Sequence, residues 1–430
     1  MNERNSLIIS IPRDWYVWFI LLILMLINYL PVVYAGPRLI ISMIEISLAG
    51  IMLFFMASTD SNMFLKNSVI LVVIFFINLL AYYHCWINTL PIGSFVIRSC
   101  MCWFYMGIGI FLKKYGSKET NRSVFHLILL LMVVTSLTSI IVARDYPTAM
   151  RGLENGSVDI KGIEKTLYKR NTATWSMVYA MTFAIPYTIV AYRKTKKLIY
   201  VFIITILSYC IFRSQITMAL LMSAMFLLLF ILKPSSPKKT CIIIGLLIIL
   251  AMLFSDEVAE LIYWLYINLF GGNTNNMLGK RFYQLYISVR DMQLVGTYSG
   301  RFDLYLTSIR TFLDNPIIGI DTHNIGNISY SELTNIVGLH SQFFDMLATT
   351  GIVCTGIVVG SFLYYVRIMD KLIEDYDDKN LFSYTIFVLV IFILLNPTYY
   401  SACVFLTVFL GPSFLQALEE SDRKRRFSFR

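Results

Sequence analysis

Arg301, His340 and Ser341 are the residues whose types and spacing best suit chemistry. They lie in a polar segment, residues 299–351, that leads into an apolar run. A helix beginning at Ser341 would present free N–H groups and a partial positive charge, which attract anions. The same field disfavours an imidazolium ion, so His340 would stay neutral and able to accept a proton. We expect an anion site with a proton acceptor here; the alternative is a histidine that simply lies at an interface.

Arg213 is a second candidate, in the sequence IFRSQITMALL before another apolar run. Arginine makes planar, bidentate contacts with phosphate oxygens and stays charged. Beside a helix start, it would suit a diphosphate at a membrane surface. The alternative is an arginine that only extends from a helix end to the interface.

The composition indicates which kind of structure positions these residues. Hydrophobic residues make up 57% of the 430 and charged residues 14%, whereas soluble domains carry about 25% charged residues. Each membrane-spanning helix needs about 20 mainly apolar residues. We predict an all-α polytopic membrane protein with about twelve transmembrane helices. The apolar runs are 15–35, 39–57, 68–87, 95–112, 124–143, 173–192, 198–212, 215–232, 240–254, 341–366, 381–396 and 400–418, the last interrupted by Gly411 and Pro412.

Basic residues at alternate ends of these runs predict the topology, because cytoplasmic loops are enriched in Lys and Arg. With the N-terminus inside, the basic segments near 4–13, 66, 113–122, 193–197, 233–239, 367–379 and 423–430 all face the cytoplasm. The formal net charge of +10 then reflects membrane orientation. We therefore expect both termini in the cytoplasm and no nucleic-acid partner.

This topology divides the chain into three parts. Residues 1–254 would hold nine transmembrane helices with an outer loop at 144–172, residues 255–340 a large extracytoplasmic loop, and residues 341–430 three helices and a basic cytoplasmic tail.

The outer loop at 144–172 contains six basic residues although it would face outward. Long loops translocate regardless of their charge. The alternative is an outer surface that holds an anionic substrate, which makes Arg144, Arg151 and Arg170 candidate substrate-binding residues.

The large extracytoplasmic loop should be helical. Residues 257–270 are aromatic and apolar but short for a span, which suits a helix lying in the membrane interface. Further on, Arg301, Tyr305 and Ser308 share one face at helical spacing. Pro316 predicts the end of that helix, because the residue before a proline leaves the helical region.

Spacing within the helix after His340 predicts close packing. Gly351 lies eleven residues after His340, which returns it to the same helical face. Gly356 and Gly360 repeat at an interval of four, a spacing that lets helices approach closely. We expect His340 to sit at the end of a tightly packed helix.

Cysteines and carboxylates indicate no metal or redox centre. All seven cysteines lie in apolar runs, whereas a disulfide framework would lie in exported loops. Glu45 is the clearest carboxylate within an apolar run. It would either pair with Arg98 or mark a lateral path for lipid.

The segment from 299 to 354 resembles the signature region of the O-antigen ligase and O-antigen or capsule polymerase superfamily. Its pattern has an arginine before an amphipathic helix, an aspartate-x-proline-x-x-glycine turn, then a histidine with a small polar residue and a glycine about ten residues on. Here these positions are Arg301, the turn at 315–319, His340 with Ser341, and Gly351.

Two positions depart from the family pattern. Arg213 resembles the arginine of a serine-arginine-glycine motif, but Phe212 precedes it and Ser214 follows it. Cys354 stands where ligases have a small or aromatic residue. These differences weigh against a ligase more than against the superfamily.

The resemblance implies a metal-independent, inverting glycosyltransferase without a cofactor at the outer face of the bacterial inner membrane. The donor would be a glycan on undecaprenyl diphosphate. His340 would be the general base for the acceptor hydroxyl, Arg213 and Arg301 would stabilise the diphosphate, and Ser341 would help bind substrate. We expect a polysaccharide polymerase, with a ligase acting on lipid A-core and a non-catalytic flippase as alternatives. The expected partners are the lipid-linked oligosaccharide, membrane lipids and a protein that regulates chain length.

Overall fold

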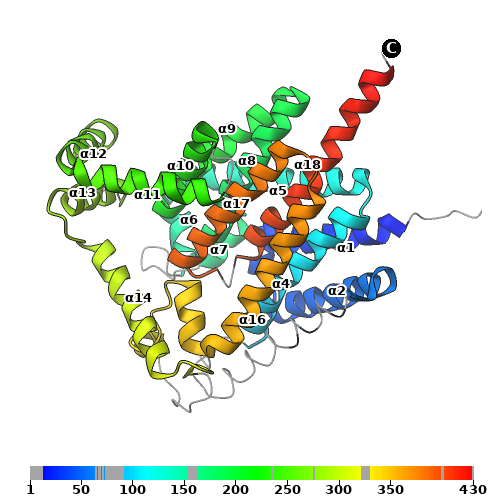
Figure 1. Ribbon diagram of the computed structural model, residues 1–430, viewed down its shortest axis with the longest axis horizontal. Helices are drawn as coiled ribbons and strands as arrows, with labels where there is room; N and C mark the ends of the chain where they lie inside the picture. The colour runs from blue at the N-terminus through cyan, green and yellow to red at the C-terminus, as the bar shows by residue number, and fades with distance from the viewer. Residues whose placement is uncertain are drawn as a thin grey trace, which may run out of the picture.

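The computed structural model describes residues 13–62, 65, 69, 72, 92–153, 162–233, 237–274, 277–320, 330–398 and 401–428. All regular elements among them are helices, and none of these residues forms a β-strand (Figure 1). The all-α prediction is therefore confirmed. The predicted span at 68–87 lies almost entirely outside the described residues.

The helices follow in chain order. The first half of the chain contains α1 (Arg13–Tyr29), the short 3-10 helix η1 (Pro31–Ala35), α2 (Arg38–Thr59), α4 (Ile92–Tyr115), α5 (Lys118–Asp145), α6 (Ala149–Gly152), α7 (Glu164–Lys169), α8 (Trp175–Thr195) and α9 (Leu198–Ser214). The second half contains α10 (Thr217–Leu232), α11 (Pro237–Leu253), α12 (Ser255–Phe270), α13 (Met277–Arg290), α14 (Thr297–Asp314), α15 (Tyr330–Leu333), α16 (Gln342–Leu372), α17 (Tyr376–Leu395) and α18 (Ala402–Ser428).

Several helices have the length and composition of membrane spans. Among the described residues, α5, α16 and α17 are long and apolar enough to cross a membrane. Shorter apolar helices cover Trp15–Tyr29, Met43–Thr59, Leu198–Ser214, Thr217–Leu232 and Ala402–Leu418. Helices of this kind are characteristic of a membrane protein. The full set of twelve spans remains a prediction.

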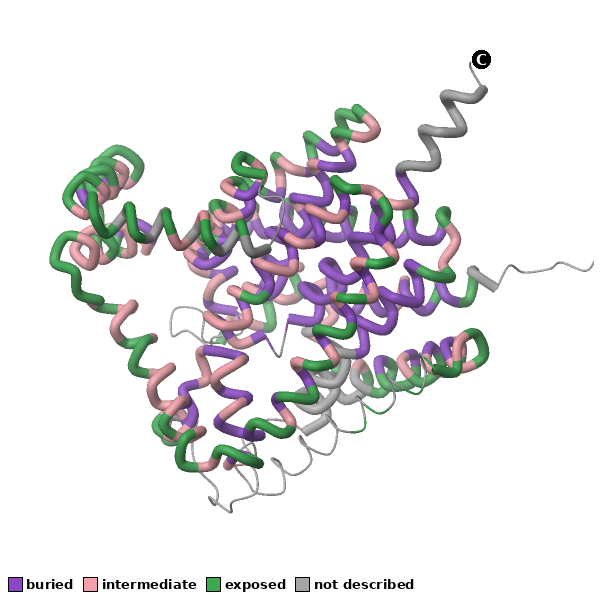
Figure 2. Tube along the Cα trace, viewed as in Figure 1, coloured by how far each residue is buried: buried purple, intermediate pink, exposed green. Residues whose placement is uncertain are grey.

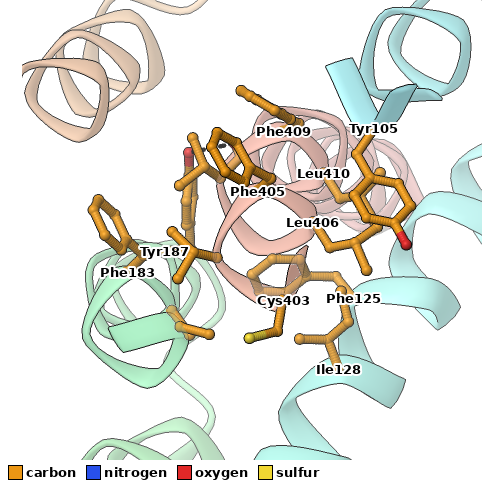
Figure 3. Packing of buried hydrophobic residues seen from close by; sticks show 14 of the residues in the cluster. Tyr105, Phe125, Ile128, Phe183, Tyr187, Cys403, Phe405, Leu406, Phe409 and Leu410 are labelled. Carbon is orange, nitrogen blue, oxygen red and sulfur yellow. Dashed lines mark hydrogen bonds between the residues drawn. The ribbon is translucent and has the colours of Figure 1, made fainter. Parts of the chain in front are cut away.

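The centre of the bundle is α18, which packs against α8, α4 and α5. Figure 3 shows Phe405 and Phe409 of α18 near Tyr187 of α8. The ring centroid of Phe125 of α5 lies 5.8 Å from that of Tyr187. Gly109 of α4 permits close approach, because a Cβ atom there would lie 2.7 Å from the carbonyl oxygen of Phe409. The core therefore depends on large aromatic rings packed against glycine.

α18 continues through Gly411 and Pro412, so the predicted interruption of this helix was wrong. Proline has no N–H to donate to the carbonyl four residues earlier, here that of Val408. Tyr187 takes this role, because its hydroxyl donates to the Val408 carbonyl at 3.2 Å. Gly411 leaves room for the ring, since a Cβ atom there would overlap Tyr187.

The bundle has two ends, which side-chain contacts identify. At one end, Lys194 Nζ lies 2.7 Å from Asp378 Oδ1, joining the end of α8 to the start of α17. At the other end, the start of α8 meets the segment before α18, and Tyr305 of α14 donates to the carbonyl of Leu395 at the end of α17. Every element that carries a candidate site residue reaches this second end.

Helices α12 and α13 of the large predicted loop stand away from the bundle, whereas α14 packs against α16. α11 leads outward to α12 and α13, and α14 returns from them to the start of α16 (Figure 1). Much of this arm is exposed or half-buried (Figure 2). Leu261, Trp264 and Leu269 of α12 are 57, 58 and 60% exposed. The helix predicted at 257–270 is confirmed, as is the end of α14 at Asp314.

The described part of the 144–172 loop is folded against the bundle. α6 and α7 share a small apolar cluster, formed by Val142, Ala149, Leu153 and Leu167. This cluster fixes α6, and with it Arg151, beside the ends of α5 and α9.

Candidate functional site

His340 lies in the turn directly before α16. Ser341 is the N-cap of this helix, because its Oγ accepts a hydrogen bond from the backbone N–H of Phe344 at 3.2 Å. The helix start predicted from the sequence is thus confirmed. His340 is half-buried, and its Nδ1 lies 3.0 Å from the carbonyl oxygen of Gly338. A carbonyl can only accept, so Nδ1 carries the proton and the Nε2 lone pair of the neutral ring is free to act as a base.

Burial is the main cause that lowers the pKa of His340. The hydrogen bond to the Gly338 carbonyl opposes this effect, and the positive charge of Arg301 lowers the pKa further. A neutral imidazole is therefore favoured at neutral pH, in the direction expected from the sequence. The physical cause is burial and a neighbouring arginine rather than the helix field alone.

Three half-buried arginines gather at this end of the bundle. They are Arg151 of α6, Arg281 of α13 and Arg301 of α14. Burial lowers the pKa of Arg151, and Arg301 lowers it further. Burial also lowers the pKa of Arg281, with further contributions from Arg151 and Arg301. We call these three residues the arginine cluster. An anion bound among them would be attracted to all three and would offset their mutual repulsion.

Tyrosines hold the cluster together. The hydroxyl of Tyr298 donates to the backbone carbonyl of Arg281 at 3.4 Å, which links α14 to α13. Burial raises the pKa of Tyr305, and its neighbour Arg301 opposes this shift. Because Tyr305 also donates to the carbonyl of Leu395 at 3.0 Å, it fixes the first turns of α14, and hence Arg301, against the end of α17.

Arg213 occupies a different place from the one predicted. It lies in the last turn of α9, whereas α10 begins only at Thr217 after a left-handed residue, Gln215. Its Nη2 donates to the carbonyl of Ala143 at 3.2 Å, so it caps the end of α5. The prediction that Arg213 heads the next helix was wrong. Its helix packs against α6, which carries Arg151.

Arg144 and Arg170 lie at the surface near the end of α5. Arg144 is exposed. Arg170 Nη1 lies 4.0 Å from Asp145 Oδ2, and the two side chains are 51% and 67% exposed. Such an exposed pair contributes little to stability. Among the three loop candidates, Arg151 is the one whose pKa is lowered by the charge of Arg301.

Gly351 divides α16 into two helical parts. Its backbone has φ 67° and ψ −174°, a conformation confined to glycine. The N–H of Ile352 donates to the Pro316 carbonyl at 2.8 Å, and that of Val353 to the Ile317 carbonyl at 3.3 Å. The 315–319 turn thus caps the second part of the helix.

The prediction that α16 packs closely against other helices through its glycines was wrong. Gly351 breaks the helix and does not lie on a regular helical face. Among the described residues, Cβ atoms added to Gly356 or Gly360 would meet nothing within 4 Å. The segment 352–372 is still about 31 Å long at 1.5 Å per residue, enough to cross a hydrocarbon core. His340 and the first part of α16 therefore precede a helical segment that is long enough to be a span.

Two residues of the site were missed from the sequence. Arg281 is one basic residue among several in the large loop, and its place near Arg301 depends on how the start of α14 meets α13. Asp345 lies in the first turn of α16, is 3% exposed and receives hydrogen bonds from the turn that carries His340. A carboxylate at the start of an apolar run was the one available signal.

Glu45 belongs to a buried polar group remote from the cluster. Asn28 Nδ2 lies 3.4 Å from Glu45 Oε1 and 3.1 Å from the Tyr105 hydroxyl, linking α1, α2 and α4. The side chain of Arg98, its predicted partner, lies outside the described residues. In the part of the chain that the structure describes, no three His, Cys, Asp or Glu side chains are grouped as metal ligands.

The comparisons with known proteins add no relative. No protein-family model matches the sequence, and no curated protein matches it. The function must therefore be inferred from the residues and the geometry of the site.

Proposed function

We propose that this protein is a polysaccharide polymerase that joins repeat units carried on undecaprenyl diphosphate. One observation carries the proposal: a histidine with a free Nε2 lies beside Arg301, which belongs to a cluster of three arginines. A base for a sugar hydroxyl and a cationic site for a diphosphate are the two requirements of this transfer. The resemblance of the 299–351 segment to polymerases and ligases supports the same chemistry.

The proposed reaction is a single displacement. Nε2 of His340 takes the proton from the acceptor hydroxyl while that oxygen forms a bond to the anomeric carbon of the donor. The bond from this carbon to the diphosphate oxygen breaks, and its electron pair leaves with the lipid diphosphate. Arg301, Arg281 and Arg151 stabilise the negative charge that develops on the leaving group. The attack from the opposite face inverts the anomeric carbon.

The proposed setting is the bacterial inner membrane, with the site at the outer face and both termini in the cytoplasm. The arrangement of basic residues supports this orientation. The segments 193–197 and 367–379 meet through the Lys194–Asp378 pair at the end of the bundle opposite the site. Cytoplasmic loops are enriched in such residues.

A polymerase fits better than a ligase. The motif departures at Phe212, Ser214 and Cys354 weaken the likeness to ligases. The basic outer loop contributes Arg151 to the cluster, so the site includes an element that the shared motif does not contain. We therefore assign the acceptor as a second lipid-linked repeat unit, with membrane lipids around the protein and a chain-length regulator as its protein partner.

Deletion of the gene, followed by analysis of surface polysaccharide and lipid-linked intermediates, tests the proposal. A polymerase deletion should collapse the ladder of chain lengths to a single repeat unit, and the unaltered gene should restore it. Full-length chains retained on the lipid carrier would instead indicate a ligase. Repeat units trapped at the cytoplasmic face would indicate a flippase, and an unchanged ladder would contradict all three.

A further inference from the structure

Asp345 is the most deeply buried carboxylate near the site, at 3% exposure in the first turn of α16. Its Oδ1 accepts hydrogen bonds from the Ser308 hydroxyl at 2.6 Å and the Leu339 N–H at 3.2 Å. Its Oδ2 accepts one from the Ser341 N–H at 3.0 Å. Both oxygens therefore bind the turn that holds His340.

Ser308 extends this network to α14. Its side chain is fully buried. While its hydroxyl donates to Asp345, its Oγ accepts the N–H of Gly338 at 2.9 Å. Gly338 has no room for a side chain, because a Cβ atom there would overlap the backbone of Leu304. The turn is thus fixed against both α14 and α16.

The turn needs this support because its backbone is strained. Leu339, directly before His340, has φ 56°. An L-residue other than glycine rarely adopts this left-handed conformation, because its Cβ atom crowds the following carbonyl oxygen. The hydrogen bond from the Leu339 N–H to Asp345 offsets that strain. Without the carboxylate, the turn would relax to an ordinary conformation and redirect the next side chain.

We propose that Asp345, acting with Ser308, is the positioning residue for His340 in the transfer reaction, which rests on the proposed function. The network fixes the Gly338 peptide, whose carbonyl accepts from Nδ1 of His340 at 3.0 Å. That bond sets both the ring orientation and the tautomer, so it keeps Nε2 available for the acceptor hydroxyl. Asp345 itself is not assigned as the base, because it is only 3% exposed and both of its oxygens already accept hydrogen bonds from the protein.

The role predicts a particular kinetic change in Asp345→Asn. The amide keeps the size of the side chain but places an N–H₂ group against one of the backbone donors. The arginine cluster is untouched, so substrate binding should persist. We expect kcat to fall about 100-fold, comparable to loss of general-base catalysis, with KM changed less than about 3-fold. Partial unfolding would also lower the apparent kcat at constant KM, so kcat is expressed per folded protein, quantified from the monodisperse peak on size-exclusion chromatography.

The experiment uses full-length protein in lipid nanodiscs and, as substrate, lipid-linked repeat units extracted from the deletion strain. Asp345→Asn and Ser308→Ala are compared with Asp303→Asn, an exposed carboxylate on α14 that should behave as the unaltered protein. Ser308→Ala removes two hydrogen bonds of the same turn, and it carries the test if Asp345→Asn does not fold. A fall in kcat at constant KM in either variant supports the role.

The inference is overturned if both folded variants keep kcat within about 3-fold of the unaltered enzyme while His340→Ala is inactive, because general-base loss alone costs at least about 100-fold. It is also overturned if KM rises in proportion to the loss of kcat/KM, since the network would then serve binding. If His340→Ala itself polymerises normally, the general-base assignment within the proposed function fails first. The His340 variant thus separates the two failures.

Discussion

Gly319 and Gly351 lie at a contact where two backbones touch. A Cβ atom on Gly319 would overlap the carbonyl of Thr349, and one on Gly351 would overlap the carbonyl of Ile317. Both glycines have positive φ angles, 71° and 67°. This contact explains why a turn ending in glycine and a glycine eleven residues after the histidine occur together. The turn supplies the carbonyls that the broken helix needs.

Alanine at Gly319 or Gly351 should destabilise the protein strongly. Each change adds backbone strain of about 1–3 kcal/mol and a steric overlap with the facing peptide. We expect a lower thermal unfolding midpoint in detergent and less monodisperse protein on size-exclusion chromatography. Gly356→Ala and Gly360→Ala are matched controls on the same helix, and both should leave stability unchanged or slightly higher. Equal effects at all four positions would contradict the assigned contact.

Substitutions should distinguish the arginines of the cluster, which act in the reaction, from the arginines at the surface. Arg281→Gln and Arg151→Gln are expected to lower kcat/KM for extracted lipid-linked repeat units by about 100-fold, since each removes a charged donor from the leaving group. Arg144→Gln and Arg170→Gln should change it less than about 3-fold, because exposed charges interact weakly. A larger loss in the second pair than in the first would place the diphosphate elsewhere.

The pH dependence follows from His340. A general base acts when neutral, so the rate should be constant at high pH and fall as His340 becomes protonated. Because burial and Arg301 lower the pKa of His340 from its usual 6.5, the fall should occur below pH 6.5. Arg301→Gln removes a positive neighbour, which raises this pKa and moves the fall to higher pH. Rate profiles of kcat for the two proteins check the direction, and a shift to lower pH would disprove the coupling.

Membrane orientation can be checked by cysteine labelling in a cysteine-free background. Lys165 and Lys197 are both exposed, near the site end and the opposite end of the bundle. Lys165→Cys should react with a membrane-impermeant maleimide in intact spheroplasts. Lys197→Cys should react only after the membrane is opened. The reverse pattern would contradict the proposed orientation.

The sequence predicted those parts of the site that depend on local order along the chain. Ser341 is an ordinary N-cap residue before an apolar run, and Pro316 follows a helix end, so both boundaries were predictable. The neutral state of His340 was predictable in direction, because a helix start and burial act in the same sense.

Features that depend on tertiary contacts were not predictable. The place of Arg281 near Arg301 depends on how the start of α14 meets α13, through Tyr298 and the Arg281 carbonyl, and no periodicity in the sequence indicates that pairing. Pro412 fails to break α18 because Tyr187, more than two hundred residues earlier, donates to the carbonyl that the proline leaves free. Gly356 and Gly360 show the reverse case, a packing motif at which no atom of the described residues lies within 4 Å of an added Cβ.

Activity of His340→Ala on extracted lipid-linked repeat units tests the central claim most directly. His126→Ala is the matched control, because His126 hydrogen-bonds Tyr200 at 2.8 Å far along the chain from the site residues. The general-base assignment predicts that polymer formation by His340→Ala falls at least about 100-fold, with folded protein present and the His126 variant active. Chains of normal length made by His340→Ala at the unaltered rate would contradict it.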